Sequence, residues 1–277
     1  MRKIFNVAKW GLSLGRESQN FLGAKWITAF LAKVPNSGKR SWALRILSLS
    51  PHYFLDPENP AYKAMSNDEY LEATFAEGVE SREKIYTHIL KDHLNGKDIV
   101  LDYGCGPGFL AKALAPHVSS VFACDISPGA LACARILNAA DNLEYVAADD
   151  AGLSLIRDES IDAVISFAMV QHITDDIFDQ VLRNMHRKLR SGGKLILHIQ
   201  LLDAVWRTED EWKGDQSLTG RIKYRYGLHC FARSEVNHIR AVETNGFSKI
   251  KITSIADFVP EQFDDICSQS LLVAVKS

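Results

Sequence analysis

The sequence predicts an α/β protein built on a doubly wound parallel sheet, with a helical extension at its N-terminus. From about residue 95 onward, short apolar runs typical of buried strands alternate with patterns of helical period. A glycine-rich turn lies between the first of these runs and the first of these helical patterns. The chain of 277 residues is 47% hydrophobic and 24% charged, the composition of an ordinary globular protein that can bury one large core.

The first fifty residues differ from the rest in charge. They hold nine Lys or Arg and one acid, Glu17, which gives a net charge of +8, whereas the remaining residues carry −10. Such an asymmetry indicates an anionic partner for the basic part. Three prolines in residues 51–60 disfavour helix and separate this segment from the rest of the chain. We therefore expect a basic helical extension over residues 1–75 and one α/β domain over residues 76–277.

The α/β domain is expected to alternate strands and helices. Apolar residues at near-helical spacing predict a helix over 68–94. The next apolar runs predict five strands, at 98–103, 120–125, 143–147, 161–167 and 194–200. The helices expected between and after them cover 109–115, 128–139, 175–188 and 234–244. Two strand-like runs, 248–255 and 271–276, have no helical pattern between them, so we expect them to pair antiparallel at the sheet edge.

The strongest local signal is a strand that runs into a glycine-rich turn, with the sequence Val100-Leu101-Asp102-Tyr103-Gly104-Cys105-Gly106-Pro107-Gly108. Glycines at this place let the backbone approach a ligand closely at the carboxyl end of the strand. The turn is not a dinucleotide fingerprint, because Phe109 stands where the third glycine would be, and it lacks the Gly-Lys-Ser/Thr of a P-loop. The Asp102 carboxylate would repel a pyrophosphate but attract an ammonium or sulfonium group.

Acidic residues also end the next two strands. Asp125 closes the strand 120–125, about where a carboxylate can accept hydrogen bonds from both hydroxyls of a ribose. Asp149 and Asp150 come directly after the strand 143–147 and Ala148. Acidic groups thus gather along one edge of the expected sheet. Such a site suits a ligand with a ribose, an adenine and a net positive charge.

In this order the motifs resemble those of the class I S-adenosylmethionine-dependent methyltransferases, over roughly residues 95–277. The resemblance includes the Asp-x-Gly-x-Gly-x-Gly turn, the acidic ends of the second and third strands, the segment Ser166–Ile173 and a Ser191-Gly192-Gly193-Lys194 turn before the fifth strand. The Asn245-Gly246-Phe247 helix end and the terminal hairpin match as well. The resemblance implies a Rossmann-like seven-stranded sheet of order 3-2-1-4-5-7-6 and S-adenosyl-L-methionine as the cofactor.

The resemblance also implies which residues bind the cofactor. Asp125 would hold the ribose, Asp149 would lie near the adenine amino group, and the glycine turn would lie beside the methionine part. Asp150 departs from close relatives, which often carry a small apolar residue at this place. The expected cofactor-binding residues are Asp102, Tyr103, Gly104, Cys105, Gly106, Gly108, Asp125, Ile126, Asp149, Asp150, Phe167 and Ala168.

The expected chemistry needs few side chains. A sulfonium is already an activated methyl donor, so in-line placement of the acceptor provides much of the acceleration. An oxygen acceptor of high pKa would also want a base within hydrogen-bond reach. His172, His198 and His229 are the candidate bases, because each is expected at or beyond the carboxyl edge of the sheet. The alternative for each of them is a structural or surface histidine, and His172 is the favoured candidate of the three.

The favoured function is methyl transfer to oxygen or nitrogen of a small molecule. Between Leu201 and His229 lie aromatic and charged residues that either wall the acceptor pocket or form a solvated loop: Trp206, Trp212, Tyr224, Arg225 and Tyr226. Two other functions stay open. One is methylation of a protein or nucleic acid that docks on the basic N-terminus, although no Asn/Asp-Pro-Pro-Tyr/Phe sequence of base-methylating enzymes follows the fourth strand. The other is a non-catalytic regulator that only binds the cofactor.

The basic segment 1–50 also bears on partners and location. Its basic residues are interleaved with aromatic and aliphatic ones, so it can form a lid or packing element, or lie at an anionic membrane surface. We favour the lid or packing role and expect no nucleic-acid partner. The five cysteines show no Cys-x-x-Cys pairing, and no apolar run reaches about 18–20 residues. We therefore expect a cytoplasmic protein, at most peripheral at a membrane, without a metal site.

Overall fold

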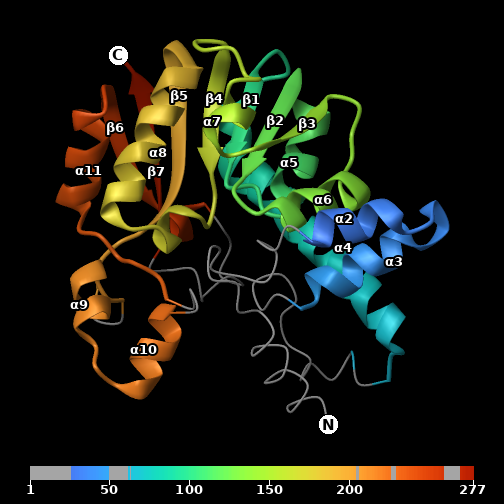
Figure 1. Ribbon diagram of the computed structural model, residues 1–277. Coiled ribbons are helices and arrows are strands. Elements are labelled where there is room, and N and C mark those ends of the chain that lie inside the picture. The colour runs from blue at the N-terminus through green and yellow to red at the C-terminus, as the bar shows by residue number, and fades with distance from the viewer. Residues whose placement is uncertain (1–25, 50–61, 63, 204–205, 226–228, 259–268) are drawn as a thin grey trace.

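The computed structural model describes residues 26–49, 62, 64–203, 206–225, 229–258 and 269–277. Its centre is a seven-stranded sheet of order β3-β2-β1-β4-β5-β7-β6, which confirms the expected order (Figure 1). Neighbouring strands pair parallel except for the two pairs that involve β7. The strands are β1 Ile99–Tyr103, β2 Ser120–Asp125, β3 Leu143–Ala147, β4 Ile161–Ser166, β5 Leu189–Gln200, β6 Phe247–Ser254 and β7 Gln269–Lys276.

Helices precede the sheet and connect its strands. None of the described helices is long and apolar enough to cross a membrane. The α-helices are α2 Trp26–Lys33, α3 Asn36–Leu47, α4 Asn67–Ile85, α5 Phe109–Leu114, α6 Pro128–Leu137, α7 Asp150–Leu153, α8 Asp175–Lys188, α9 Glu209–Gly214, α10 Leu218–Arg225 and α11 Glu235–Thr244. Shorter turns are η3 Tyr86–Leu90, a π-helix, and the 3₁₀-helices η4 Lys91–His93, η5 Ala115–His117, η6 Val170–His172 and η7 Ile255–Asp257.

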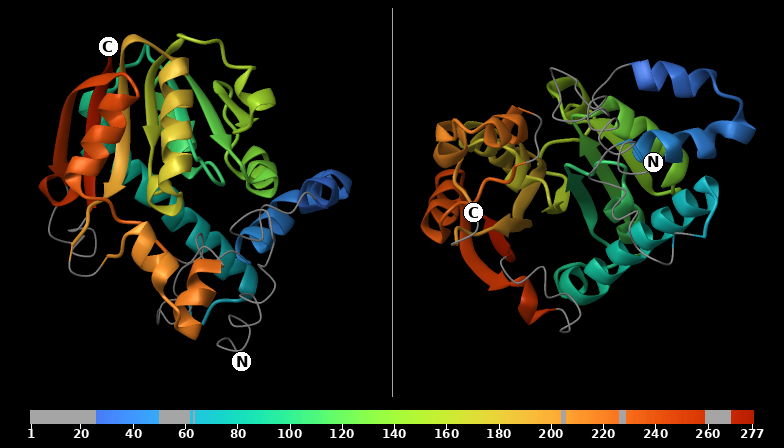
Figure 2. Two further views of the ribbon diagram at one scale, coloured as in Figure 1. Left: turned by 60° about the vertical axis from the view of Figure 1, so that its left-hand side comes forward. Right: turned by 90° about the horizontal axis from the view of Figure 1, so that it is seen from below.

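Helices cover both faces of the sheet (Figures 1 and 2). On one face α8 buries residues 178, 181, 182 and 185, a helical spacing that turns one apolar stripe toward the strands. Its acidic first turn and basic last turn suit the helix dipole. On the other face α5 and α6 contribute Leu110, Leu114 and Leu131 to a second core. A third cluster joins α2, α3 and α4 to α6, so the described part of the N-terminal extension packs on the α/β domain.

Helix α4 begins on a strong N-terminal signal and runs through the expected domain boundary at residue 75. The Ser66 side chain accepts from the Glu69 N–H while the Glu69 carboxylate accepts from the Ser66 N–H, a capping box. The helix expected over 68–94 is present as α4 followed by the η3 and η4 turns. Because α4 is one continuous helix across residue 75, the division of the chain stays a prediction, and we propose to place it before Asn67.

Two details of the chain differ from expectation. Strand β5 begins at Leu189 rather than at 194, because the expected turn at Gly192 and Gly193 lies within the strand, where the pairing register with β4 shifts. Gly192 has a φ of +73°, which lets the backbone bend there without leaving the sheet. Segment 201–229 contains α9 and α10, which no periodicity indicated; the capping box of Thr208 with Glu211 was the one local signal for α9.

A buried guanidinium just after this segment ties the chain to the loop after β4. Arg233 donates from Nη1 to the Val170 carbonyl at 2.9 Å and from Nη2 to the Ile173 carbonyl at 2.6 Å. Its Nε donates to the Asp175 carboxylate at 2.6 Å, and the guanidinium lies 4.8 Å from the centre of the Phe178 ring. One side chain therefore fixes residues 170–175 against the start of α8.

We expect Arg233→Lys to lower the free energy of unfolding by about 1–3 kcal/mol, because an ammonium cannot reproduce the three directed hydrogen bonds of the planar guanidinium. Urea denaturation measures the change. The matched control is Arg190→Lys, whose side chain is 53% exposed beside Asp162 and should cost less than about 0.5 kcal/mol. Equal losses in the two variants would contradict the clamping role of Arg233.

Candidate functional site

The carboxyl ends of the parallel strands form the candidate site. The chain crosses from β3 to β4 on the far side of β1, so the loops after β1 and β4 leave the sheet in opposite directions and open a crevice between them. This edge lies below the sheet in Figure 1, and the right-hand view of Figure 2 looks onto it, with α9 and α10 on one side and α2 to α4 on the other. The site is built from the loops at this edge.

Unsatisfied polar atoms gather at the same edge. Five buried side-chain polar atoms among the described residues lack a hydrogen-bond partner. Three of them belong to the ends of β1 and β4 or to the loop after β4: Asp102 Oδ2, Ser166 Oγ and Gln171 Oε1. A buried polar atom without a partner is costly, so such a concentration marks a place built to receive a polar ligand.

The turn after β1 is built from left-handed backbone. Gly104, Gly106 and Gly108 have φ values of +83°, +53° and +80°. A Cβ on Gly108 would overlap the Tyr145 side chain, and one on Gly104 would overlap Met169. The Gly104 and Cys105 N–H groups donate to the Cys124 carbonyl at 2.8 and 3.0 Å, which fixes the turn to β2. The Cys105 side chain is buried, so the turn offers a ligand mainly backbone.

Asp102, at the end of β1, is only 2% exposed. Burial and, next, the nearby Asp125 carboxylate raise the pKa of Asp102 to about 7, against the opposing effects of the Ala111 N–H and, after it, the Arg82 guanidinium. Asp102 therefore takes up a proton near neutral pH unless a cation is placed beside it. Its neighbour Tyr103 points to the opposite face of the sheet, where its hydroxyl accepts from Asn184 Nδ2 at 3.5 Å. Of these two expected residues, only Asp102 directs its side chain to the face that carries Arg82.

Asp125, at the end of β2, binds backbone in two loops. Its Oδ2 accepts from the Gly106 N–H at 2.8 Å and its Oδ1 from the Ser127 N–H at 2.7 Å. Burial raises the pKa of Asp125, although both N–H donors lower it. The carboxylate thus ties the glycine turn to the start of α6. The next side chain, Ile126, is 75% exposed and offers an apolar surface beside it.

Asp149 and Asp150 lie after β3, where the sheet edge continues. Asp149 caps α7 by accepting from the Gly152 N–H at 2.7 Å, and Asp150 is the first residue of that helix. Both residues are exposed. A Cβ on Gly152 would overlap the Ala147 carbonyl, so the turn from β3 into α7 needs glycine there. The strand order therefore arranges Asp102, Asp125 and Asp149 along one edge, in the order β1, β2 and β3.

The loop after β4 carries the expected residues Phe167 and Ala168. Ala168 has a φ of +57°, which is unusual for a residue with a side chain, and its N–H donates to His198 Nδ1 at 3.2 Å. The Phe167 ring stacks on the His198 ring with centroids 4.3 Å apart. The turn at Ala168 brings Met169 against Gly104, so the loop after β4 packs directly on the glycine turn.

The three candidate histidines have different surroundings. His172 is partly buried, and its Nδ1 donates to the His229 carbonyl at 3.2 Å, which puts the lone pair of the neutral ring on Nε2. His198 is 2% exposed with both ring nitrogens hydrogen-bonded, and burial lowers its pKa to about 4. His229 is also buried, which lowers its pKa, and its Nδ1 donates to the Lys223 carbonyl at 3.3 Å. Of the three, only His172 is less than fully buried, so only His172 stays a candidate base.

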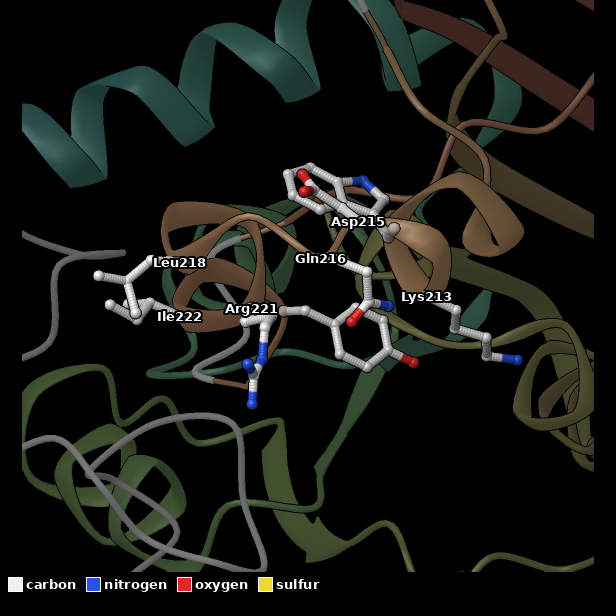
Figure 3. A pocket seen from close by; sticks show the side chains of 8 residues that line it. Lys213, Asp215, Gln216, Leu218, Arg221 and Ile222 are labelled. Atoms are coloured by element: carbon white, nitrogen blue, oxygen red, sulfur yellow. The ribbon is translucent and has the colours of Figure 1, made fainter.

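The end of segment 201–229 and the residues just after it contact the loop that carries His172. The Phe231 N–H donates to the Gln171 carbonyl at 2.6 Å, and Tyr224 stacks on His229 with centroids 4.9 Å apart. Between α9 and α10 lies an open cavity of about 490 Å³, walled by Trp212, Tyr224 and neighbouring residues (Figure 3). Tyr226 and the side chain of Arg225 lie outside the described residues. The described part of the segment thus contains two short helices around a cavity that is lined by two aromatic side chains and by polar and aliphatic ones.

Sequence reasoning missed two residues of this edge. Arg82, in the last turn of α4, acts electrostatically on both Asp102 and His198, so helix α4 brings a cation to the glycine turn. Met169 covers Gly104. Met169 lies within the Ser166–Ile173 segment and could have been singled out there. Arg82 had no local signal, because only the packing of α4 on α5 and on the sheet brings it to the site.

Comparisons with known proteins agree with this geometry. Residues 101–197 match the family model described as a methyltransferase domain. The ubiquinone biosynthesis O-methyltransferase of Pseudomonas syringae is 34% identical over 107 residues, which are 37% of this chain and 44% of that protein. The enzyme of the same name from Xanthomonas campestris is 32% identical over 100 residues, 35% of this chain and 41% of that protein. The chain thus spans less than half the length of these relatives.

Solved structures share the fold at low sequence identity. A TehB-like methyltransferase from Corynebacterium glutamicum is 17% identical and aligns over 79% of this chain and 100% of its own, with a TM-score of 0.50. An S-adenosylmethionine-dependent methyltransferase from Mesorhizobium loti is 18% identical over 70% of this chain and 98% of its own, with a TM-score of 0.51. Residues 101–197 therefore form a methyltransferase domain, within a sheet of the strand order expected of the class I S-adenosylmethionine-dependent methyltransferases.

Proposed function

We propose that this protein uses S-adenosylmethionine to methylate a small molecule, at oxygen or nitrogen. The observation that carries the proposal is the buried Asp102 carboxylate, whose Oδ2 has no partner among the described residues and which comes just before a turn of left-handed glycines. That arrangement suits a ligand with a cationic end and a close backbone contact. The similarity to O-methyltransferases of ubiquinone biosynthesis favours oxygen as the acceptor atom.

The cofactor-binding residues follow from their order along the sheet edge. The Gly104–Gly108 turn and Asp102 would hold the cationic methionine part, and the Arg82 guanidinium would attract its carboxylate. Asp125 keeps further lone pairs on both oxygens and can accept from ribose hydroxyls while it holds the turn. Ile126 offers an apolar surface to the adenine, and Asp149 and Asp150 offer acceptors to its amino group.

The protein's part in the chemistry is positioning and proton removal. The bound cofactor supplies an activated methyl group on a sulfonium. The loop after β4, held by Arg233 and packed on Gly104, lies beside the turn that would hold it. His172, oriented by the His229 carbonyl, can take the proton of a hydroxyl acceptor at Nε2. Helices α9 and α10 would exclude water and shape the acceptor side.

Cofactor binding should depend on pH through Asp102. The pKa of Asp102 is raised to about 7 without a ligand, and a bound cation should lower it, so binding releases a proton below that pH. The affinity for S-adenosylmethionine should therefore rise about eightfold from about pH 6 to about pH 7.5 and then level off. Titration calorimetry measures the affinity, and Asp102→Asn should bind more weakly and without this dependence. No heat of binding at either pH would refute the proposed cofactor.

His172→Ala should lower kcat by about 10²–10⁴ for a hydroxyl acceptor while the cofactor affinity changes little, because a general base acts only in the methyl-transfer step. A radiolabelled methyl-transfer assay against fractionated small molecules and lipids provides the acceptor and the rate. His88→Ala, at an exposed histidine of η3, is the control and should keep full activity. If both variants were equally active, His172 would be structural.

We further propose that the N-terminal extension brings the enzyme to an anionic membrane surface. Trp26 is 53% exposed and Trp42 is 47% exposed, and the Phe30 ring packs edge-on against both. Exposed tryptophans beside cations suit the interface of a bilayer. Arg40 and Arg45 pair with acids of α4, whereas Lys33 and Lys39 have no ion-pair partner among the described residues. The remaining basic residues of this segment, in 1–25, lie outside that part of the chain.

Co-sedimentation with vesicles tests this surface. The full chain should pellet with anionic vesicles at low salt, and less with neutral vesicles or at high salt, since each basic residue near an anionic surface adds about 1 kcal/mol. The double variant Trp26→Ser, Trp42→Ser should bind several-fold more weakly. Leu218→Ser removes another exposed apolar side chain, 74% exposed on α10, and should not change binding. A wild-type chain that stayed in the supernatant with anionic vesicles would exclude the membrane role.

A further inference from the structure

His198 connects three segments of the site although it is buried within the sheet. It lies on β5 and pairs with Leu271 of β7. One ring nitrogen, Nδ1, accepts from the Ala168 N–H at 3.2 Å, and the other, Nε2, lies 2.6 Å from Gln269 Oε1 at the start of β7. Because a backbone N–H can only donate, Nδ1 carries the lone pair, and Nε2 carries the proton that it donates to Gln269. Gln269 therefore selects the tautomer that can hold Ala168.

Ala168 needs such a partner because its backbone is strained. A φ of +57° places its Cβ too close to the following carbonyl, at a cost that glycine would not have. Ala168 is exposed, so burial of its own side chain does not compensate. The described contacts that hold it are the hydrogen bond to His198 and the stacking of the preceding Phe167 on the same ring. Strain of this kind persists where the surroundings over-determine the conformation, and it is concentrated at functional sites.

The conformation at Ala168 decides where the next residues lie. Met169 follows and packs on Gly104 of the glycine turn, and His172 is three residues further on. A relaxed Ala168 would move Met169 away from the turn and change the direction in which η6 leaves β4. The effect of His198 is thus transmitted along the backbone to both the expected cofactor-binding turn and the candidate base.

We propose that His198 is a positioning residue that holds the loop after β4 in its strained conformation, with Gln269 fixing the imidazole tautomer. This rests on the proposed function, because its consequence is tighter cofactor binding and correct placement of His172. His198 is not the proton acceptor in this scheme, since its only lone pair is occupied by the Ala168 N–H and the ring is buried.

Four variants separate positioning from a general contribution to stability. His198→Phe keeps an aromatic ring for Phe167 but removes the acceptor. His198→Asn restores a short acceptor near the place of Nδ1. Ala168→Gly removes the Cβ strain, so the hydrogen bond is needed less. His238→Phe is the matched control. His238 is 1% exposed, and burial lowers its pKa to about 4, as for His198. Its ring contacts Phe178 and the Gln200 carbonyl, not the loop after β4.

The first measurement needs no cofactor. Amide hydrogen exchange followed by NMR should find the Ala168 N–H protected in the wild-type protein, although the residue is exposed. Protection should be lost in His198→Phe and retained in His238→Phe. If His198→Phe does not fold, Gln269→Ala is the second variant. It removes the acceptor that fixes the His198 tautomer and should reduce the protection of the Ala168 N–H. A wild-type Ala168 amide that exchanges as fast as an unprotected one would overturn the proposal.

The second measurement is the affinity for S-adenosylmethionine by calorimetry. His198→Phe should bind about tenfold more weakly, the loss that corresponds to relaxation of one left-handed alanine. His198→Asn should recover most of the affinity. Adding Ala168→Gly to His198→Phe should do the same. A merely structural role of His198 would produce neither recovery. Unchanged affinity in folded His198→Phe would refute the positioning role. If the wild type did not bind S-adenosylmethionine but the protection of the Ala168 N–H still depended on His198, only the proposed function would be refuted.

Discussion

The pairing of β1 with β4 is the constraint on which the site depends. Asp102 of β1 lies in register with Ile165 of β4, although 63 residues separate them and the chain forms β2 and β3 in between. This pairing sends the loops after β1 and β4 to opposite faces and opens the crevice between their carboxyl ends. It also brings Met169 onto Gly104. The glycine turn, the acidic strand ends and the loop with His172 have their relative positions because these two strands are neighbours.

The polar groups at this edge carry an energetic cost that the rest of the fold offsets. Asp102, Ser166 and Gln171 each bury a polar atom without a partner, and the pKa values of Asp102 and Asp125 are raised. Such groups destabilise the ligand-free protein. The two apolar clusters on the faces of the sheet supply the compensating burial. A cationic, hydroxyl-rich ligand would satisfy these groups, so the same features that weaken the empty site favour binding.

Burial and partners separate three histidines that look equivalent in the sequence. His198 and His229 are nearly inaccessible, burial lowers the pKa of both, and each acts through fixed hydrogen bonds. His172 is partly buried and is oriented by the His229 carbonyl. His229 thus supports the candidate base, while His198 supports the loop that carries it. An expected set of alternative bases becomes one candidate base and two residues that position it.

The sequence by itself determined the order of the strands along the chain, the main helices between them, the glycine turn and the acidic strand ends, because periodicity, turn glycines and the ordered motifs are local signals. Together with the family resemblance, these predicted the sheet order, which is confirmed, and the cofactor-binding residues, which stay a prediction. Only the tertiary structure decided that Tyr103 faces the opposite core, that Arg82 lowers the pKa of Asp102, and that His198 holds Ala168. The physical reason is that burial, pKa and hydrogen-bond partners depend on neighbours distant in the chain, which no local pattern encodes.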